Sequence, residues 1–226
     1  MTSTAAAGEL PQPRSARDRL ATARLCVLVA GGADPAGFER LVGTLLAAGV
    51  AMLQVRDKQL SDEALIDRCR RALALARCHA PAAPPLVLVN DRVEVAIAAA
   101  IDGVHLGAAD LPVTLARQRL GPATLIGRTA HTQAEARAAV AAGADYLGVG
   151  PCFPSLTKTF SQQAPSDFLA AAAVLPLPVF AIGGIDVERI GKLGTLGITR
   201  VAVAGAITSA ADPAAAAGAI LAALHR

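Results

Sequence analysis

Short apolar runs alternate with helix-compatible segments along most of this 226-residue chain. There are eight such runs: Leu25 to Ala30, Ala51 to Val55, Leu86 to Val89, Gly103 to Leu106, Thr124 to Gly127, Asp145 to Val149, Pro178 to Ile182 and Thr199 to Ala204. Between them, apolar residues recur at intervals of three and four, as on amphipathic helices, in Glu39 to Ala48, Asp62 to His79, Gln133 to Ala142 and Val187 to Leu193. Alternating strands and helices predict right-handed crossovers and a parallel sheet, and eight strands predict a sheet that closes into a single (β/α)8 TIM barrel.

A weak internal repeat supports one barrel domain over residues 25–226. The second, fourth, sixth and eighth runs each follow small residues and a Gly or Asp turn, in segments that begin at Leu46, Ala98, Ala141 and Thr195. Such two-strand modules leave no interior domain boundary. The alternative is an open doubly wound sheet, but no GxGxxG follows the first run, and Gly31-Gly32-Ala33-Asp34 is a poor substitute.

Composition narrows the classes of function. Hydrophobic residues make up 54% of the chain and charged residues 17%, which is typical of a globular protein. The net charge is +3, and no basic run is interleaved with aromatics, so we expect no nucleic-acid partner. The four cysteines lack CxxC spacing, as expected for reduced thiols in a cytoplasmic protein, and no apolar run is long enough to span a membrane. Residues 1–24 are expected to form a disordered tail.

Two acidic residues follow neighbouring predicted strands. Asp91 closely follows the run that ends at Val89, and Asp110 follows the run that ends at Leu106. Because the carboxyl ends of adjacent parallel strands lie side by side, we expect these carboxylates to approach one another. Two such groups suit Mg2+, which leaves its other coordination positions to water and phosphate. The alternative is that each aspartate only caps a helix.

Cations and hydroxyls follow other predicted strands. Strand alternation places Gln54, Arg56 and Lys58 on one side at the end of the second strand. The longest loop, Gly148 to Pro165, contains hydroxyl and ammonium groups of the types that bind phosphate, Ser155, Thr157 and Lys158. Cations that face a barrel mouth are costly unless the ligand is anionic, and the alternative is a solvated strand end and loop.

Small residues end the last two predicted strands, at Gly183-Gly184 and Ala204-Gly205. Such residues let backbone N–H groups approach an anion closely, and barrels commonly bind phosphate at this position. At the end of the fifth strand, Thr129 offers a hydroxyl to the barrel mouth. We interpret His105 and His131 as structural side chains, because a histidine within or beside an apolar strand is usually hydrogen-bonded in the core.

These motifs together resemble the thiamine-phosphate synthase family from about Leu25 to the C-terminus. They are Gln-x-Arg-x-Lys at Gln54 to Lys58, Asn-Asp-Arg at Asn90 to Arg92, Asp-Gly-Val-His-Leu at Asp102 to Leu106, Asp-Leu-Pro at Asp110 to Pro112, Gly-x-Gly-Pro-x-Phe-Pro-Ser-x-Thr-Lys at Gly148 to Lys158 and Ala-Ile-Gly-Gly-Ile at Ala181 to Ile185. Each motif alone is moderately specific, but their order along the chain is specific.

The resemblance implies a transferase that acts on small-molecule substrates. Asp91 and Asp110 would hold Mg2+ on the diphosphate of 4-amino-2-methyl-5-hydroxymethylpyrimidine diphosphate. The residues implied to contact that substrate are Gln54, Arg56, Lys58, Asn90, Thr129 and Lys158, of which Arg56, Lys58 and Lys158 would be the catalytic cations. The residues implied to seat the phosphate of 4-methyl-5-(2-hydroxyethyl)thiazole phosphate, or of its carboxylated form, are Ser155, Thr157, Gly184, Ala204 and Gly205. Family members often have Ser where this chain has Thr129 and Gly205.

Physical chemistry agrees with this reaction. Diphosphate leaves with roughly three negative charges, which Mg2+ and three cationic side chains would offset as they develop. The aminopyrimidine stabilises a methylene cation, so a dissociative path needs no protein nucleophile. Two other functions remain open. One is a thiazole tautomerase of the same barrel family, which generally lacks the second aspartate and the Gln-x-Arg-x-Lys set. The other is a non-catalytic sensor of phosphate ligands. The sequence leaves the oligomeric state open, a homo-oligomer included, and predicts no membrane partner.

Overall fold

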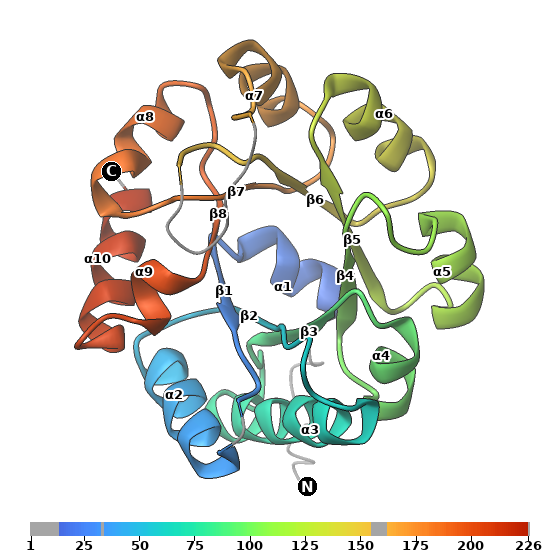
Figure 1. Ribbon diagram of the computed structural model, residues 1–226, viewed down its shortest axis with the longest axis vertical. Coiled ribbons are helices and arrows are strands. Elements are labelled where there is room, and N and C mark those ends of the chain that lie inside the picture. The colour runs from blue at the N-terminus through green and yellow to red at the C-terminus, as the bar shows by residue number, and fades with distance from the viewer. Residues whose placement is uncertain (1–13, 33, 155–161, 226) are drawn as a thin grey trace, which may run out of the picture.

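Eight parallel strands close into a barrel in chain order, as Figure 1 shows. The computed structural model describes residues 14–32, 34–154 and 162–225. Each strand pairs with the next one along the chain, and β8 pairs with β1 through Leu25 and Val201. The predicted (β/α)8 barrel is therefore confirmed, and the alternative of an open sheet is wrong.

The bounds of the elements are close to those that the sequence predicts. The strands are β1 (Leu25–Val29), β2 (Met52–Val55), β3 (Leu86–Asn90), β4 (Gly103–Leu106), β5 (Leu125–Ala130), β6 (Tyr146–Val149), β7 (Val179–Ile182) and β8 (Val201–Val203). The helices are α1 (Ala16–Thr22), α2 (Pro35–Ala47), α3 (Asp62–His79), α4 (Val93–Ala99), α5 (Val113–Leu120), α6 (Gln133–Ala141), α7 (Ser166–Ala173), the 3-10 turn η1 (Val187–Arg189), α8 (Ile190–Gly194), α9 (Gly205–Thr208) and α10 (Pro213–Leu224). Among the strands the largest difference is in β5, which runs to Ala130 rather than Gly127, and α2 begins at Pro35, four residues before the predicted Glu39.

Local capping chemistry fixes where several helices begin. Ser61 accepts a hydrogen bond from the backbone of α3, and Thr132 does the same for α6. Asp34 and Asp212 cap α2 and α10, each followed by a proline at the first helical position. These side chains satisfy N–H groups that would otherwise have no partner, so each helix starts at a defined residue directly after its loop.

The apolar core has two layers. One layer fills the space between the strands and the surrounding helices, with residues such as Val27, Leu53 and Val104 fully buried. The other lies inside the barrel toward its amino end and contains Met52, Leu88, Leu125, Tyr146 and Phe180. Because side chains fill the amino half of the barrel, a binding site is expected at its carboxyl end.

The expectation of a disordered tail over residues 1–24 is wrong for Ala16–Thr22, which form α1. Ser15 and Asp18 build a reciprocal capping box at its start, and Leu20 joins the core layer inside the barrel. Arg19 donates to Pro84 O at 2.8 Å and to Asp102 Oδ1 at 2.5 Å, both at the amino end of the barrel. A seven-residue helix has little intrinsic stability, so these tertiary contacts, which sequence pattern does not reveal, account for its order.

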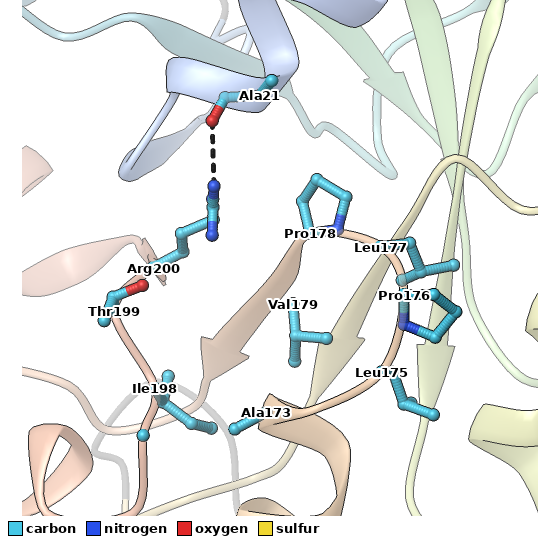
Figure 2. A pocket seen from close by; sticks show the side chains of 11 residues that line it. Ala21, Ala173, Leu175, Pro176, Leu177, Pro178, Val179, Ile198, Thr199 and Arg200 are labelled. Carbon is cyan, nitrogen blue, oxygen red and sulfur yellow. Dashed lines mark hydrogen bonds between the residues drawn. The ribbon is translucent and has the colours of Figure 1, made fainter.

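A second arginine fastens the end of α1 to the same face of the barrel. Arg200, directly before β8, donates to Ala21 O at 2.9 Å, as Figure 2 shows. It also donates to Ala23 O at 3.2 Å. The surface pocket drawn in Figure 2 lies beside these contacts, between the connections that lead into β7 and β8. This pocket therefore lies at the amino end, opposite to the end where the predicted site residues are found.

Aspartates at the amino end explain part of the internal repeat. Asp102, just before β4, accepts a hydrogen bond from Val87 N in β3 at 2.8 Å. Asp145, just before β6, accepts one from Ile126 N in β5 at 2.7 Å. Asp102 therefore fastens β4 to β3, and Asp145 fastens β6 to β5.

Among the helices of the described ranges, none has the length and apolar character needed to cross a membrane.

Asp145→Ala is expected to lower the free energy of unfolding by about 2–4 kcal/mol, because it leaves Ile126 N and Arg117 without their buried partner. Urea denaturation followed by circular dichroism measures this change. The control is Arg119→Ala, which breaks an exposed ion pair with Glu94 and should cost less than about 1 kcal/mol. Equal losses in the two variants would contradict a structural role for Asp145.

Candidate active site

Side chains from four neighbouring strands meet at the carboxyl end of the barrel. Gln54 on β2 donates through Nε2 to Asn90 Oδ1 on β3 at 2.7 Å. His105 on β4 lies 2.9 Å through Nε2 from the hydroxyl of Thr129 on β5. Asp91 donates its backbone N–H to His105 O at 2.8 Å and thereby joins the two halves. The structure therefore brings Gln54, Asn90 and Thr129 to one rim, as the sequence predicts.

The carboxyl groups of Asp91 and Asp110 lie near one another at this rim, close enough for Asp110 to affect the ionisation of Asp91. Neither aspartate caps a helix: the N-cap residues of α4 and α5 are Arg92 and Pro112, and neither helix has a side-chain cap. The backbone of Asp91 has a φ of 63°, in the left-handed region that non-glycine residues rarely occupy. Such a conformation is characteristic of functional sites.

Burial raises the pKa of Asp91 to about 6, and the neighbouring carboxyl group of Asp110 acts in the same direction. The nearby Lys58 and Arg56 partly offset this rise. Ionisation of both carboxyl groups is thus unfavourable without a cation, and a hard divalent cation would relieve the repulsion between them. Within residues 14–32, 34–154 and 162–225, no third Asp, Glu, His or Cys joins them. The pair fits Mg2+, which needs only one or two carboxylates when substrate phosphates complete its coordination.

Without metal, the contribution of Asp91 to the free energy of unfolding should be lost as pH rises from about 4 to about 6. The unfolded chain releases the Asp91 proton near pH 4, whereas the folded state keeps it until about pH 6. At pH 7.5 and without metal, we expect Asp91→Asn to be more stable than the wild type by about 1–2 kcal/mol, a value reduced for solvent access to the rim. At pH 4 the difference should fall below about 0.5 kcal/mol. Urea denaturation in a chelator at both pH values tests this, and a difference independent of pH would refute it.

Two cations lie beside the carboxylate pair, and an aspartate between them is turned away. Arg56 is half-buried and Lys58 is exposed, and no described carboxylate forms an ion pair with either. Asp57 accepts backbone hydrogen bonds from Gly32 N at 3.0 Å, Gln59 N at 2.8 Å and Leu60 N at 3.2 Å. Burial opposes its ionisation, but these donors hold the pKa of Asp57 below its ordinary value. The carboxylate therefore shapes the loop and leaves the two cations for a ligand.

The loop that follows β2 is also hydrogen-bonded to the loop that follows β3. Arg92 donates to Leu60 O and to Asp62 Oδ1, each at 2.9 Å. The sequence motif that contains Arg92 does not reveal this role, because one of its partners is a backbone carbonyl, which leaves no sequence pattern. Its hydrogen bonds hold the loop that carries Lys58 next to the loop that carries Asp91.

The structural interpretation is confirmed for His105, whereas His131 is exposed and not part of the core. His105 is buried between Tyr146 OH, 3.0 Å from Nδ1, and the Thr129 hydroxyl. Burial lowers the pKa of His105 to about 4, so the imidazole is neutral at physiological pH. His131 lies with Nδ1 2.6 Å from Gly150 O, on the backbone that follows β6. His105 thereby fixes the direction of the Thr129 hydroxyl at the rim.

Close packing explains the glycine pair after β7. A Cβ added to Gly184 would lie 2.3 Å from Pro154 O, and one added to Gly183 would lie 2.7 Å from Pro151 Cβ. Both glycines also have positive φ values, 61° and 90°. The loop after β6 continues against this turn, with Phe153 N donating to Gly183 O at 3.1 Å. Only glycine fits here, so the pair has a packing role besides any role in anion binding.

The remaining predicted residues fall into two groups. Ala204 and Gly205 lie at the end of β8, where Ala204 is the N-cap of α9. Ser155, Thr157 and Lys158 lie outside the described residues, which include only 148–154 and 162–165 of their loop. Cys152, within the described part, is buried, and burial raises the pKa of its thiol to about 12. A thiol in this state is not a nucleophile at physiological pH.

Comparisons with known proteins agree with this geometry. A family model described as thiamine monophosphate synthase matches residues 25–207. The thiamine-phosphate synthase of Anaeromyxobacter dehalogenans is 45% identical over 202 residues, which are 88% of this chain and 86% of that protein. The thiamine-phosphate synthase of a Synechocystis strain is 41% identical over 83% of this chain, which spans 55% of that longer protein.

The solved structures include one with the same description. A thiamine phosphate pyrophosphorylase from Pyrococcus furiosus superposes with a TM-score of 0.79 and is 28% identical, over 92% of this chain and 97% of that one. A 3-hexulose-6-phosphate synthase has a TM-score of 0.61 at 20% identity, a likeness that shows the shared barrel alone. By its sequence matches, its closed barrel and the motifs at its rim, this chain belongs to the thiamine-phosphate synthase family.

Proposed function

We propose that this protein joins 4-amino-2-methyl-5-hydroxymethylpyrimidine diphosphate to 4-methyl-5-(2-hydroxyethyl)thiazole phosphate, or to its carboxylated form, and forms thiamine phosphate and diphosphate. The reaction replaces the bond between the pyrimidine methylene and diphosphate oxygen with a bond to the thiazole nitrogen. One observation carries the proposal: a pair of neighbouring carboxyl groups, Asp91 and Asp110, lies beside the cations Arg56 and Lys58. This arrangement suits a diphosphate that carries a divalent cation.

Asp91 and Asp110 would hold Mg2+ at this rim. When bound, Mg2+ would neutralise charge on the diphosphate oxygens and make the diphosphate a better leaving group. The side chains of Arg56 and Lys58 offset the rest of the roughly three negative charges that develop as diphosphate departs. Lys158 remains a prediction as the third cation, because it lies outside the described residues.

The amide pair on β2 and β3 would orient the pyrimidine. The hydrogen bond from Gln54 Nε2 to Asn90 Oδ1 fixes both side chains and leaves the Gln54 carbonyl oxygen and the Asn90 amide nitrogen for a ligand. An acceptor beside a donor complements an aminopyrimidine edge. Thr129, held by His105, would supply a further hydroxyl contact. The methyl group that Thr129 carries relative to the serine of many relatives narrows the pocket at that position.

The thiazole phosphate would bind on the opposite side of the barrel mouth, at the ends of β7 and β8. Gly184, Ala204 and Gly205 present backbone N–H groups without bulky side chains, and Ser155 and Thr157 are the predicted hydroxyl donors. This subsite stays a prediction. A dissociative path requires no nucleophile from the protein, and the buried, un-ionised thiol of Cys152 is consistent with that. A location in the cytoplasm also stays a prediction.

The test is a turnover assay with purified protein, both substrates and Mg2+, in which mass spectrometry detects thiamine phosphate. Product should form with Mg2+ and disappear in excess EDTA, and added Mg2+ should restore it. Product formation unchanged by EDTA would refute the metal assignment. A tautomerase would instead isomerise the carboxylated thiazole phosphate alone, without metal or pyrimidine diphosphate, and that assay run in parallel distinguishes the two activities.

A further inference from the structure

Arg128 reaches from β5 to the loop that carries Asp110. The pairing of β4 with β5 places Arg128 opposite Leu106, the last residue before this loop. One terminal nitrogen of its guanidinium group, Nη2, donates to Ala108 O at 2.9 Å, and the other, Nη1, donates to Leu111 O at 3.2 Å. The two hydrogen bonds lie on either side of Asp110 in the sequence, so one side chain holds the loop both before and after the aspartate.

The turn around Asp110 is closed at its start as well. Asp110 N donates to Gly107 O at 3.1 Å, and Asp110 Oδ2 accepts from Gly107 N at 2.7 Å. These bonds commit one carboxylate oxygen to the turn. In the part of the chain that the structure describes, no side chain other than that of Arg128 donates to a carbonyl of residues 107–112. Leu111 also packs against the core, but Arg128 is the side chain that fastens the backbone on both sides of Asp110 to β5.

The charge of Arg128 does not explain why an arginine lies so near the proposed Mg2+ site. Its positive charge disfavours a bound divalent cation, although the exposure of the loop screens that effect. Arginine has a planar fork that binds two acceptors at once, which lysine does not have. The geometry of Arg128 uses that fork on two carbonyl oxygens and forms no ion pair with a described carboxylate. Arg128 therefore acts through its two hydrogen bonds, which fix the position of the loop that carries Asp110.

We propose that Arg128 is a positioning residue, which holds the β4 loop so that Asp110 lies opposite Asp91 at the spacing that one metal ion requires. This inference rests on the proposed Mg2+ site. Residues that orient metal ligands typically contribute about 10- to 100-fold to metal affinity. Loss of the fork should therefore weaken metal binding even though it removes a repelling charge.

The experiment measures Mn2+ binding, with inorganic diphosphate present as the anionic ligand, by the electron paramagnetic resonance signal of free Mn2+. We expect Arg128→Met and Arg128→Lys each to raise the Kd about 10- to 100-fold. The matched control is Arg200→Met, since Arg200 also donates to two backbone carbonyls but at the amino end of the barrel. Its Kd should stay within about twofold of the wild type. Turnover of the Arg128 variants should recover as Mg2+ is raised, with a higher half-saturating concentration.

Three results would overturn the inference. The first is an Arg128→Met protein that is folded by circular dichroism and binds Mn2+ as tightly as the wild type. That result would show that the hydrogen bonds of Arg128 are not needed to position Asp110. Full recovery in Arg128→Lys would show that charge acts instead of the fork. An equal loss in Arg200→Met would show general loosening of the barrel. Failure of the wild type itself to bind Mn2+ with diphosphate would overturn the proposed metal site as well, so the two failures are distinguishable.

Discussion

Asp91→Asn is expected to lower turnover on the order of 10³-fold at saturating substrates, because it removes one of two carboxylates that hold the metal on the departing diphosphate. Asparagine keeps the size of the side chain and tolerates the φ of 63° at this position better than alanine does. The variant should therefore keep its fold, and in the absence of metal it should be more stable than the wild type. Steady-state assays over a range of Mg2+ concentrations measure the loss.

The matched control for this substitution is Asp34→Asn. Asp34 also follows a strand at the carboxyl end of the barrel, but it caps α2 through hydrogen bonds to Ala36 N and Gly37 N. Asparagine is an equally good cap, so turnover should remain within about twofold of the wild type. A folded Asp91→Asn enzyme with wild-type turnover would rule out Asp91 as a metal ligand.

Arg56→Met is expected to lower kcat/KM for the pyrimidine diphosphate by about 10²- to 10³-fold, since the cation stabilises charge that develops on the leaving group. Arg56→Lys should keep part of the activity, because it keeps the charge and loses only the fork. The KM for thiazole phosphate should change little in either variant, as that substrate is proposed to bind near β7 and β8. An equal effect on both substrates would place Arg56 between the subsites rather than at the diphosphate.

The fold and the pairing of the two aspartates could be predicted from sequence because both follow from strand order. Alternating apolar runs fix a parallel barrel, and in a parallel barrel the residues after neighbouring strands share one rim. Asp91 and Asp110 are separated by a helix and a strand in sequence, yet the structure places them near enough to affect each other's ionisation. The choice between metal ligand and helix cap required coordinates, because both functions use the same residue type at the same position.

Other features were hidden from sequence reasoning because they depend on backbone partners. Arg92 and Arg128 hold neighbouring loops through carbonyl oxygens, which are present at every residue and so leave no pattern. The helix α1 is ordered by contacts to Pro84 and Asp102, which are distant in sequence. The length of β5 was underestimated because Arg128 and Thr129 are polar, although both lie on the strand.

The most direct test of the central claim is a crystal structure of the protein with Mg2+ and diphosphate, the leaving group of the proposed reaction. We predict one metal ion bound by the carboxylates of both Asp91 and Asp110, with diphosphate oxygens completing its coordination and with Arg56 and Lys58 in hydrogen-bonding distance of the diphosphate. Diphosphate bound at β7 and β8 with no metal at the two aspartates would contradict the account.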